Sequence, residues 1–260
     1  MNKRNHTGWG CSVLILLILG LGLWRLMPRQ PGWADDGIQT DAEKAITAFC
    51  AQNDLSPADY PDELVELLER NPETEDFVLH YPLNRKKVVA VDLSAYEGIN
   101  GVPLFLQWDP QWGCLEYGGK CAALTGCGPV CLSMAAYYLT GDKAYSPDKM
   151  IGFAKKGGYY APGSGSSWTL ISEGGVELGF EVTELPLVKS RIFRELEAGW
   201  PIICAMGKGD FTTSGHFIVL TGVEDGLLRV NDPNSRANSE KLWKFEDIEG
   251  QFRNLWGIQK

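Results

Sequence analysis

The residues with the clearest chemical potential are a cysteine, a histidine and an aspartate at the ends of predicted elements. Cys127 lies in Thr125-Gly-Cys-Gly-Pro129, directly before a predicted helix. The unpaired N–H groups and the positive dipole end of a helix N-terminus favour a thiolate over a thiol. The same N–H groups point to the place where an oxyanion forms when a thiolate attacks a carbonyl. A cysteine in such a stretch is more often a small buried residue or half of a disulfide, so its partners must decide.

Two such partners lie in a predicted hairpin. His216 precedes an apolar run at 217–221, a turn follows at 224–226, and Asp232 ends a second run at 227–231. Antiparallel pairing brings the ends of the two runs together, so the His216 and Asp232 side chains can meet. Histidine is the usual base for a thiol, and a carboxylate on its other nitrogen fixes its tautomer. We therefore expect Cys127, His216 and Asp232 to act as nucleophile, base and orienting residue.

The elements that must position these residues can be predicted from periodicity. The helix after Cys127 starts with Pro129, ends at Gly141 and has one apolar face: Leu132, Ala135, Ala136 and Leu139. Further helices are predicted over 61–70, 145–154, 167–178 and 190–198, an extended segment over 88–93, and strands over 202–206, 217–221 and 227–231. Helices followed by an antiparallel sheet indicate an α+β domain.

The N-terminal part divides into segments of different composition. Residues 1–28 contain an almost wholly apolar run from Trp9 to Trp24, shorter than the roughly 20 residues that span a bilayer unaided. We expect an uncleaved signal anchor there, with the rest of the chain outside the cytoplasm, or a secreted protein if the signal is cleaved. A linker follows at 29–39, then a helical lead-in at 40–99 that starts with a capping box at Thr40 and Glu43. The main domain is expected at 100–260, and whether residues 38–95 act as an inhibitory pro-segment is left open by the sequence.

Charge and cysteine usage exclude several classes of protein. The net charge of −9 and the lack of Lys/Arg clusters argue against nucleic-acid binding. Gly118-Gly-Lys120 lacks the first glycine and the Ser/Thr of a phosphate-binding loop, so no nucleotide partner is expected. The seven cysteines contain no Cys-x-x-Cys pair, so a structural zinc site is not expected. Cys114 and Cys121 could form a disulfide in an oxidising compartment, whereas Cys50 and Cys204 fit buried free thiols.

Four further residues are candidates for the site. Gln107 interrupts the apolar run 102–106, either as a surface-facing strand residue or as an amide aimed at an oxyanion. Tyr159 and Tyr160 lie in a Gly/Ser-rich stretch at 157–167 that could line a groove or be a mobile connection. We expect these two tyrosines and the neighbouring Trp168 to contact substrate.

Four motifs together resemble the bacterial double-glycine (bacteriocin-processing) peptidases, a branch of the papain-like cysteine peptidases: 106–112 (LQWDPQW), 125–129 (TGCGP), 214–220 (SGHFIVL) and 230–235 (VNDPNS). The resemblance spans roughly residues 100–260 and implies a papain-like fold. It implies Cys127 as nucleophile, His216 as base, Asp232 as orienting residue and Gln107 as the oxyanion side chain. Gln107 lies 20 positions before Cys127, farther than in the family's compact pattern. The sequence shows no transporter or ATP-binding part, so no role in bacteriocin export is implied.

These observations predict a membrane-anchored or secreted thiol hydrolase of peptide or amide bonds, working through a Cys127 thioester and needing no metal or organic cofactor. Its expected partners are a peptide or cell-wall-derived substrate and, through the N-terminal segment, the membrane. One alternative is a catalytically inactive papain-like domain that binds peptide or cell-wall components. Another is transfer to an amine in place of hydrolysis.

Overall fold

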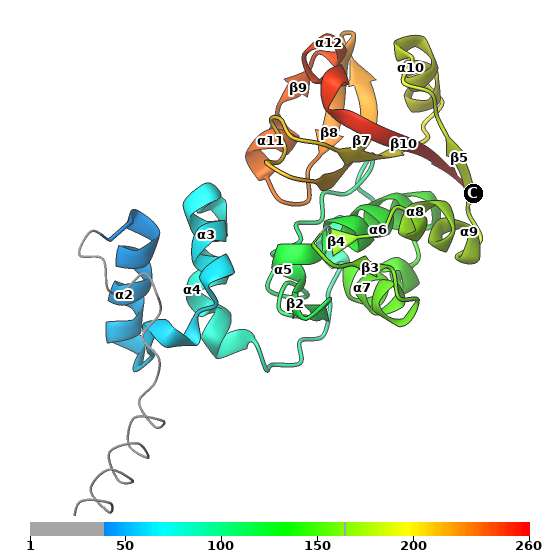
Figure 1. Ribbon diagram of the computed structural model, residues 1–260. Helices are drawn as coiled ribbons and strands as arrows, with labels where there is room; N and C mark the ends of the chain where they lie inside the picture. Colours follow the sequence, from blue (N-terminus) through cyan, green and yellow to red (C-terminus); the bar gives the residue numbers. More distant parts are fainter. Residues whose placement is uncertain (1–38, 164) are drawn as a thin grey trace, which may run out of the picture. The chain divides into compact units, whose positions relative to one another are not determined.

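The structure, a computed structural model, describes residues 39–163 and 165–260 (Figure 1). The contacts divide the chain into two compact units, Met1–Asp62 and Glu63–Lys260. The anchor predicted over 1–28 and nearly all of the predicted linker lie outside the described residues. Within the described part, every helix is too short or too polar to cross a membrane.

The described part of the first unit contains one α-helix, α2 (Asp41–Asn53), and the short 3-10 helix η2 (Pro57–Asp59). The capping box predicted at the start of α2 is confirmed. The Glu43 N–H donates to Thr40 Oγ1 at 3.3 Å, and the Thr40 N–H donates to Glu43 Oε2 at 2.6 Å. Ile46 and Cys50 lie on the buried face of this helix.

The second unit starts with α3 (Asp62–Arg70), η3 (Pro72–Thr74), α4 (Glu75–Asn84) and η4 (Ser94–Tyr96). The leucine stripe predicted for α3 is confirmed, since Leu64, Leu67 and Leu68 are all buried. The extended segment predicted at 88–93 joins no described strand, and Val88 is fully exposed. The segment therefore forms no strand, and its last residue, Leu93, is buried.

Helix α6 (Cys127–Thr140) is the central helix of this unit. It follows the single turn α5 (Ala122–Thr125) and ends, as predicted, at Gly141, whose φ of 67° favours glycine. It begins at Cys127 itself, so Pro129 is its third residue and not its first. Leu132, Ala135 and Ala136 are fully buried.

The remaining helices are short. The helix predicted over 167–178 is two separate turns, α8 and α9. Helix α7 starts at Pro147 as predicted, and α10 starts and ends one residue before the predicted 190–198 segment. Their bounds are η5 (Lys143–Tyr145), α7 (Pro147–Lys156), α8 (Thr169–Ser172), α9 (Gly174–Glu177), α10 (Lys189–Glu197), α11 (Arg236–Glu240), α12 (Phe245–Ile248) and η6 (Glu249–Gln251).

A six-stranded antiparallel sheet has the order β5-β10-β6-β7-β8-β9. Its strands are β5 (Glu181–Glu184), β6 (Ile202–Met206), β7 (His216–Glu224), β8 (Leu227–Asn231), β9 (Leu242–Trp243) and β10 (Phe252–Gln259). The predicted hairpin of β7 and β8 is confirmed. Two small hairpins lie outside this sheet: β1 (Glu116–Tyr117) with β2 (Lys120–Cys121), and β3 (Tyr160–Ala161) with β4 (Gly165–Ser166).

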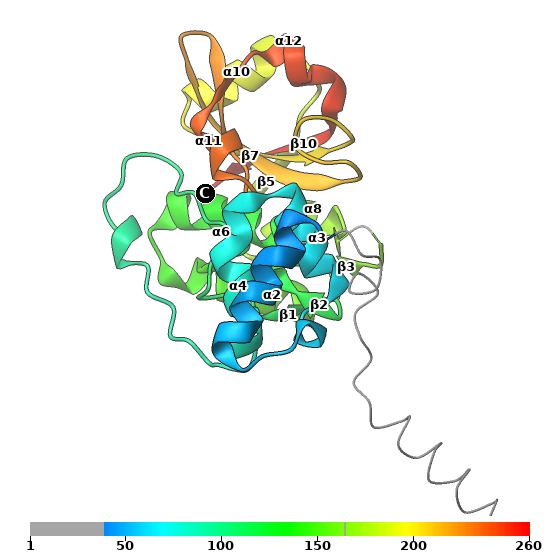
Figure 2. The ribbon, with the colours of Figure 1, turned by 90° about the vertical axis from the view of Figure 1, so that its left-hand side faces the viewer.

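Both faces of the large sheet are covered. Figures 1 and 2 show α6 and α8 on one side of it and α10 and α12 on the other. Alternate residues of β7 therefore enter different cores, with Phe217 and Val219 in the core that contains α6, and Ile218 and Leu220 in the core that contains α10. The predicted α+β class with an antiparallel sheet is confirmed.

Candidate active site

Cys127 is the first residue of α6 and is 9% exposed. The first N–H groups of a helix have no partner within the helix, so the start of α6 offers donors beside the sulfur. The β3–β4 hairpin lies close to this helix start. A Cβ added to Gly128 would be 2.5 Å from Ser166 Oγ, which shows how closely β4 approaches the turn that carries Cys127.

His216 starts β7, and its Nε2 atom lies 2.7 Å from Oδ1 of Asp232, just beyond the end of β8. The two side chains are 8% and 1% exposed. The predicted meeting of these residues across the hairpin is thus present. Because burial weakens the competition from water, this charge-assisted hydrogen bond is stronger than a similar one on the surface.

The Asp232 carboxylate is held by donors from its own loop. The Asn234 N–H donates to Oδ1 at 2.9 Å, and Asn238 Nδ2 donates to Oδ2 at 2.9 Å. The Asp232 N–H in turn donates to Ser239 Oγ at 2.9 Å. Each carboxylate oxygen therefore has a fixed donor besides the histidine, and this restricts how the group can rotate.

The electrostatics of His216 connect it to both neighbours. Burial lowers its pKa, but the carboxylate of Asp232 and the nearby Cys127 side chain raise it, and the balance raises the pKa to about 10. Since Nε2 is bonded to Asp232, Nδ1 is the ring nitrogen left for Cys127. A raised histidine pKa favours an imidazolium, which stabilises a thiolate beside it.

Gln107 connects the cysteine side of the site to the aspartate side. Its backbone N–H donates to the Pro233 carbonyl at 2.7 Å, and its Nε2 donates to the Ala123 carbonyl at 2.6 Å. It is 4% exposed and lies in a turn, so the alternative of a surface-facing strand residue was wrong. Its Oε1 atom has no hydrogen-bond partner among the described residues. Nε2 carries a second hydrogen that is available for another acceptor.

The three predicted substrate contacts lie on or beside the β3–β4 hairpin. The Tyr159 hydroxyl donates to Glu177 Oε2 at 3.2 Å, and the Tyr160 ring lies edge-on to Tyr117 at 5.5 Å. Trp168 is 47% exposed and lies 5.8 Å from the buried ring of Trp256. The side chains of Tyr159 and Tyr160 thus have different neighbours, and substrate contact stays a prediction for all three.

Tyr117 and Ser166 were not found by sequence reasoning. The Tyr117 hydroxyl lies 3.0 Å from Ser166 Oγ, and both side chains are buried. Burial raises the pKa of Tyr117 to about 12, with a further contribution from the nearby Cys127. Tyr117 belongs to a hairpin of two-residue strands, which is too short to produce a periodic signal.

The other described cysteines differ from Cys127 in their partners. Cys114 and Cys121 are free thiols, so the disulfide that the sequence left open is not formed here. Burial raises the pKa of Cys121 to about 12. Cys131, one turn after Cys127 in α6, and Cys204 are fully buried, and burial raises the pKa of both well above its ordinary value. Cys127 is distinguished by its place beside His216, whose pKa it helps to raise.

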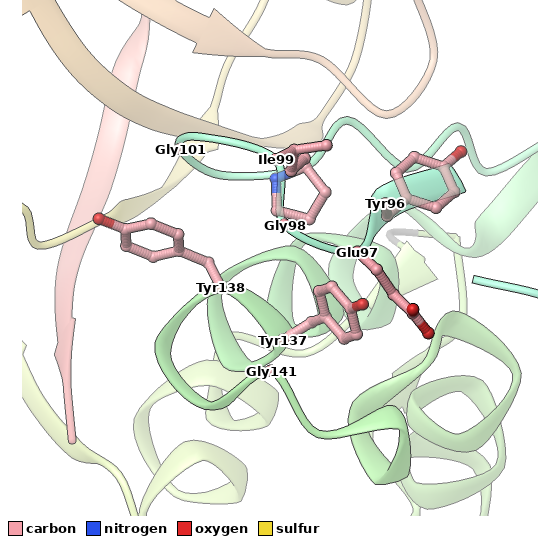
Figure 3. A pocket seen from close by; sticks show the side chains of 9 residues that line it. Tyr96, Glu97, Gly98, Ile99, Gly101, Tyr137, Tyr138 and Gly141 are labelled. Atoms are coloured by element: carbon pink, nitrogen blue, oxygen red, sulfur yellow. The ribbon is translucent and has the colours of Figure 1, made fainter. Parts of the chain in front are cut away.

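A cavity of about 310 Å³ lies at the opposite end of α6 (Figure 3). It is lined by Tyr96, Glu97, Tyr137, Tyr138 and Gly141 among others, and Glu97 pairs with Lys143 at 2.6 Å. Tyr137 and Tyr138 are in the last turns of α6, whereas Cys127 is in the first. The cavity is therefore separate from the cysteine site.

A family model described as "Peptidase_C39 like family" matches residues 99–260, well over half of the chain. Among solved structures, the chain is similar to the peptidase domain of Streptococcus ComA, described as a bi-functional ABC transporter involved in a quorum sensing pathway. That match has 18% identity and a TM-score of 0.41 and covers 52% of this chain and 91% of the other. A putative C39-like peptidase from Bacillus anthracis matches with 13% identity and a TM-score of 0.42, over 62% of this chain and 98% of the other. No curated protein matches the chain.

Proposed function

The chain belongs to the Peptidase_C39-like family, and from that premise we propose that it is a thiol hydrolase that cleaves a peptide or amide bond with Cys127 as its nucleophile. The observation that carries the proposal is the arrangement around His216. One ring nitrogen is bonded to the buried carboxylate of Asp232, and the side chain of Cys127, at the start of a helix, is near enough to the ring to raise its pKa. This is the relation of nucleophile, base and orienting residue that acyl transfer requires.

In the first half of the reaction, His216 holds the proton of Cys127, and the thiolate attacks the substrate carbonyl carbon. The carbonyl oxygen becomes an oxyanion, for which the Cys127 N–H and the free hydrogen of Gln107 Nε2 are the proposed donors. The His216 imidazolium then gives its proton to the departing amine, and a thioester on Cys127 remains.

In the second half, His216 takes a proton from water, and the resulting hydroxide attacks the thioester carbonyl. The tetrahedral intermediate releases the carboxylic acid, and the sulfur of Cys127 leaves and regains its proton from His216. Throughout, Asp232 keeps Nδ1 directed at the reacting atoms and stabilises the positive imidazolium. Every proton and bond is accounted for by these residues, substrate and water.

We further propose that residues 1–28 anchor the chain in a membrane, with the hydrolase outside the cytoplasm, where its substrate is a peptide or a peptide of the cell wall. The support is the apolar run from Trp9 to Trp24 between Lys3, Arg4 and Arg25. If the signal is cleaved, the same domain is secreted. Protease protection of the C-terminal part in intact and opened cells tests this orientation.

The hydrolase is tested with the purified full chain in detergent. A library of short peptides is incubated with wild-type protein and with Cys127→Ala, and the products are read by mass spectrometry. Cys114→Ala is the matched control, because it removes another free and partly exposed thiol, whose pKa is raised by burial. We expect cleavage by wild type and Cys114→Ala and none by Cys127→Ala.

The products separate the alternatives. Turnover retained in Cys127→Ala overturns the assignment of the nucleophile. A new amide joined to an added amine, in place of a free carboxylate, indicates transfer. A folded protein that cleaves nothing, and whose Cys127 is alkylated by iodoacetamide no faster than a peptide thiol, is an inactive binding domain.

A further inference from the structure

The loop that follows Asp232 is hydrogen-bonded to Glu73, a residue that lies before the range 99–260 matched by the family model. The Glu73 carboxylate accepts three hydrogen bonds from this loop: from Ser235 Oγ at 3.0 Å, from the Arg236 N–H at 2.9 Å and from the Ala237 N–H at 3.2 Å. All belong to the second compact unit. A single side chain before residue 99 thus binds three consecutive residues of the loop.

The same loop determines where the Asp232 carboxylate points. Asn234, directly before the residues held by Glu73, donates its N–H to Oδ1, and Asn238, directly after them, donates Nδ2 to Oδ2. The Ser235 N–H donates to the Asp232 carbonyl at 3.2 Å. The residues that donate to Glu73 therefore lie between Asn234 and Asn238, the two donors that fix the Asp232 carboxylate.

The turn that carries Glu73 is itself firmly held. Asn71 accepts from the Glu73 N–H through Oδ1 at 3.2 Å and donates through Nδ2 to the Asn234 carbonyl. The fully buried Thr74 donates its hydroxyl to the Asn71 carbonyl at 2.7 Å. With the buried leucines of α3 before it and Phe77 of α4 after it, this turn is a fixed support.

We propose that Glu73 is a positioning residue for the hydrolase: through the 233–238 loop it keeps Asp232 aimed at His216, so the working catalytic unit includes the turn at 71–74. The inference rests on the proposed function. It assigns to part of the lead-in a supporting role in the site in place of an inhibitory one.

The chemistry of the contact requires a carboxylate. All three partners of Glu73 are donors, and a carboxylate can accept from all of them, whereas glutamine offers a single acceptor oxygen. In Glu73→Gln, the amide NH₂ would face a backbone N–H, so at least one of the three hydrogen bonds is lost. In Glu73→Ala all three hydrogen bonds are lost. The predicted order of effect is therefore wild type, then Glu73→Gln, then Glu73→Ala.

The test is the pKa of His216 in the full chain, measured by NMR titration of the imidazole signals. The chain has three histidines, so His6→Gln and His80→Gln variants assign the His216 signal. The charged or titratable groups facing the ring are Asp232 and Cys127. If Glu73 positions Asp232, the pKa of His216 falls from about 10 toward the ordinary value of about 6.5. The fall is partial in Glu73→Gln and larger in Glu73→Ala.

Glu75→Gln is the matched control, because it makes the same charge change at an exposed position two residues away. An unchanged His216 pKa in folded Glu73→Ala, or in folded Glu73→Gln if the alanine variant does not fold, overturns the inference. So does an equal fall in Glu75→Gln. The titration needs no substrate, so its failure is distinct from that of the proposed function: a protein that cleaves nothing but shows the ordered fall refutes only the hydrolase.

Discussion

The Nε2 atom of His216 lies 2.7 Å from Oδ1 of Asp232, with both side chains more than nine-tenths buried. This contact assigns a role to each ring nitrogen, because Nδ1 is then the one that remains for Cys127. It also makes the charge state of the imidazole depend on one carboxylate. The predictions about pH and about the aspartate follow from this relationship.

Stability should depend on pH through His216. Its pKa is raised to about 10 in the folded chain, against about 6.5 in the unfolded chain. A raised pKa means that the folded state binds the proton more tightly, so the stabilisation is complete below about pH 6.5 and is lost as pH rises toward about 10. The loss should be on the order of a few kcal/mol.

The measurement is urea unfolding of wild type and His216→Gln at intervals from pH 6 to pH 10. The difference between their free energies of unfolding should shrink as pH rises. Repeating the pair in a Cys127→Ser background keeps titration of the thiol out of the comparison. A difference that stays constant over this range contradicts the raised pKa.

Replacing Asp232 should separate its charge from its hydrogen bonds. Asp232→Asn keeps an acceptor for Nε2 but loses the charge and one of the acceptors used by Asn234 and Asn238. We expect the His216 pKa to fall and Cys127 alkylation at pH 6 to slow about tenfold or more, since each pKa unit corresponds to a factor of ten. Asp232→Ala should slow it further because orientation is lost too. Equal alkylation rates in all three proteins would mean that the carboxylate does not act on the cysteine through the histidine.

Gly128→Ala should disturb the contact between β4 and the start of α6, beside Cys127. The added Cβ would lie 2.5 Å from Ser166 Oγ and 2.6 Å from Ser166 Cβ, so β4 must move. We expect a loss of about 1–3 kcal/mol in the free energy of unfolding, typical of overpacking. The control is Gly152→Ala, a helical position with open space around it, where alanine should stabilise by about 0.5–1 kcal/mol.

A second substitution tests whether the clash with Ser166 causes the loss of stability in Gly128→Ala. Ser166→Gly removes the clashing atoms, so the double variant Gly128→Ala/Ser166→Gly should recover most of the stability lost through the clash, which a double-mutant cycle measures. If the two substitutions are additive, the clash is not the reason for the loss.

The parts of the site that could be predicted from the sequence carry local signals. The glycines and proline around Cys127 indicate a helix start, and the turn at 224–226 between two apolar runs indicates the hairpin that joins His216 to Asp232. Glu73 carries no such signal, since 162 positions separate it from Ser235 and an isolated glutamate on a polar turn is ordinary. A contact between distant residues on irregular loops leaves no periodic pattern.

The break between α8 and α9 falls at Glu173, directly before the two glycines that begin α9. The sequence predicts one helix over 167–178 that runs through Gly174 and Gly175. Glycine is a weak helix former, but two glycines alone do not require a helix to end. Both glycines are closely packed: a Cβ on Gly175 would lie 2.7 Å from Val182, and one on Gly174 would lie 3.2 Å from Phe153. Close approach of other elements requires glycine here, and sequence patterns do not reveal which elements approach.

Gln107 should act on the transition state more than on substrate binding. Its Nε2 is already bonded to the Ala123 carbonyl at 2.6 Å, which fixes the amide beside the segment that leads into Cys127 and leaves one hydrogen for an oxyanion. Loss of a single oxyanion donor lowers kcat about 10²–10³-fold. With a peptide from the library, Gln107→Ala should therefore lower kcat by about this factor while KM changes little.

Gln107→Glu should be at least as damaging, because a carboxylate would oppose both the Ala123 carbonyl and a developing oxyanion. Gln111→Ala, which removes an amide from the same loop, is the control for loop damage. If Gln107→Ala raises KM and leaves kcat unchanged, the oxyanion role is wrong, and the side chain serves to hold substrate or to join Ala123 to the loop at Pro233.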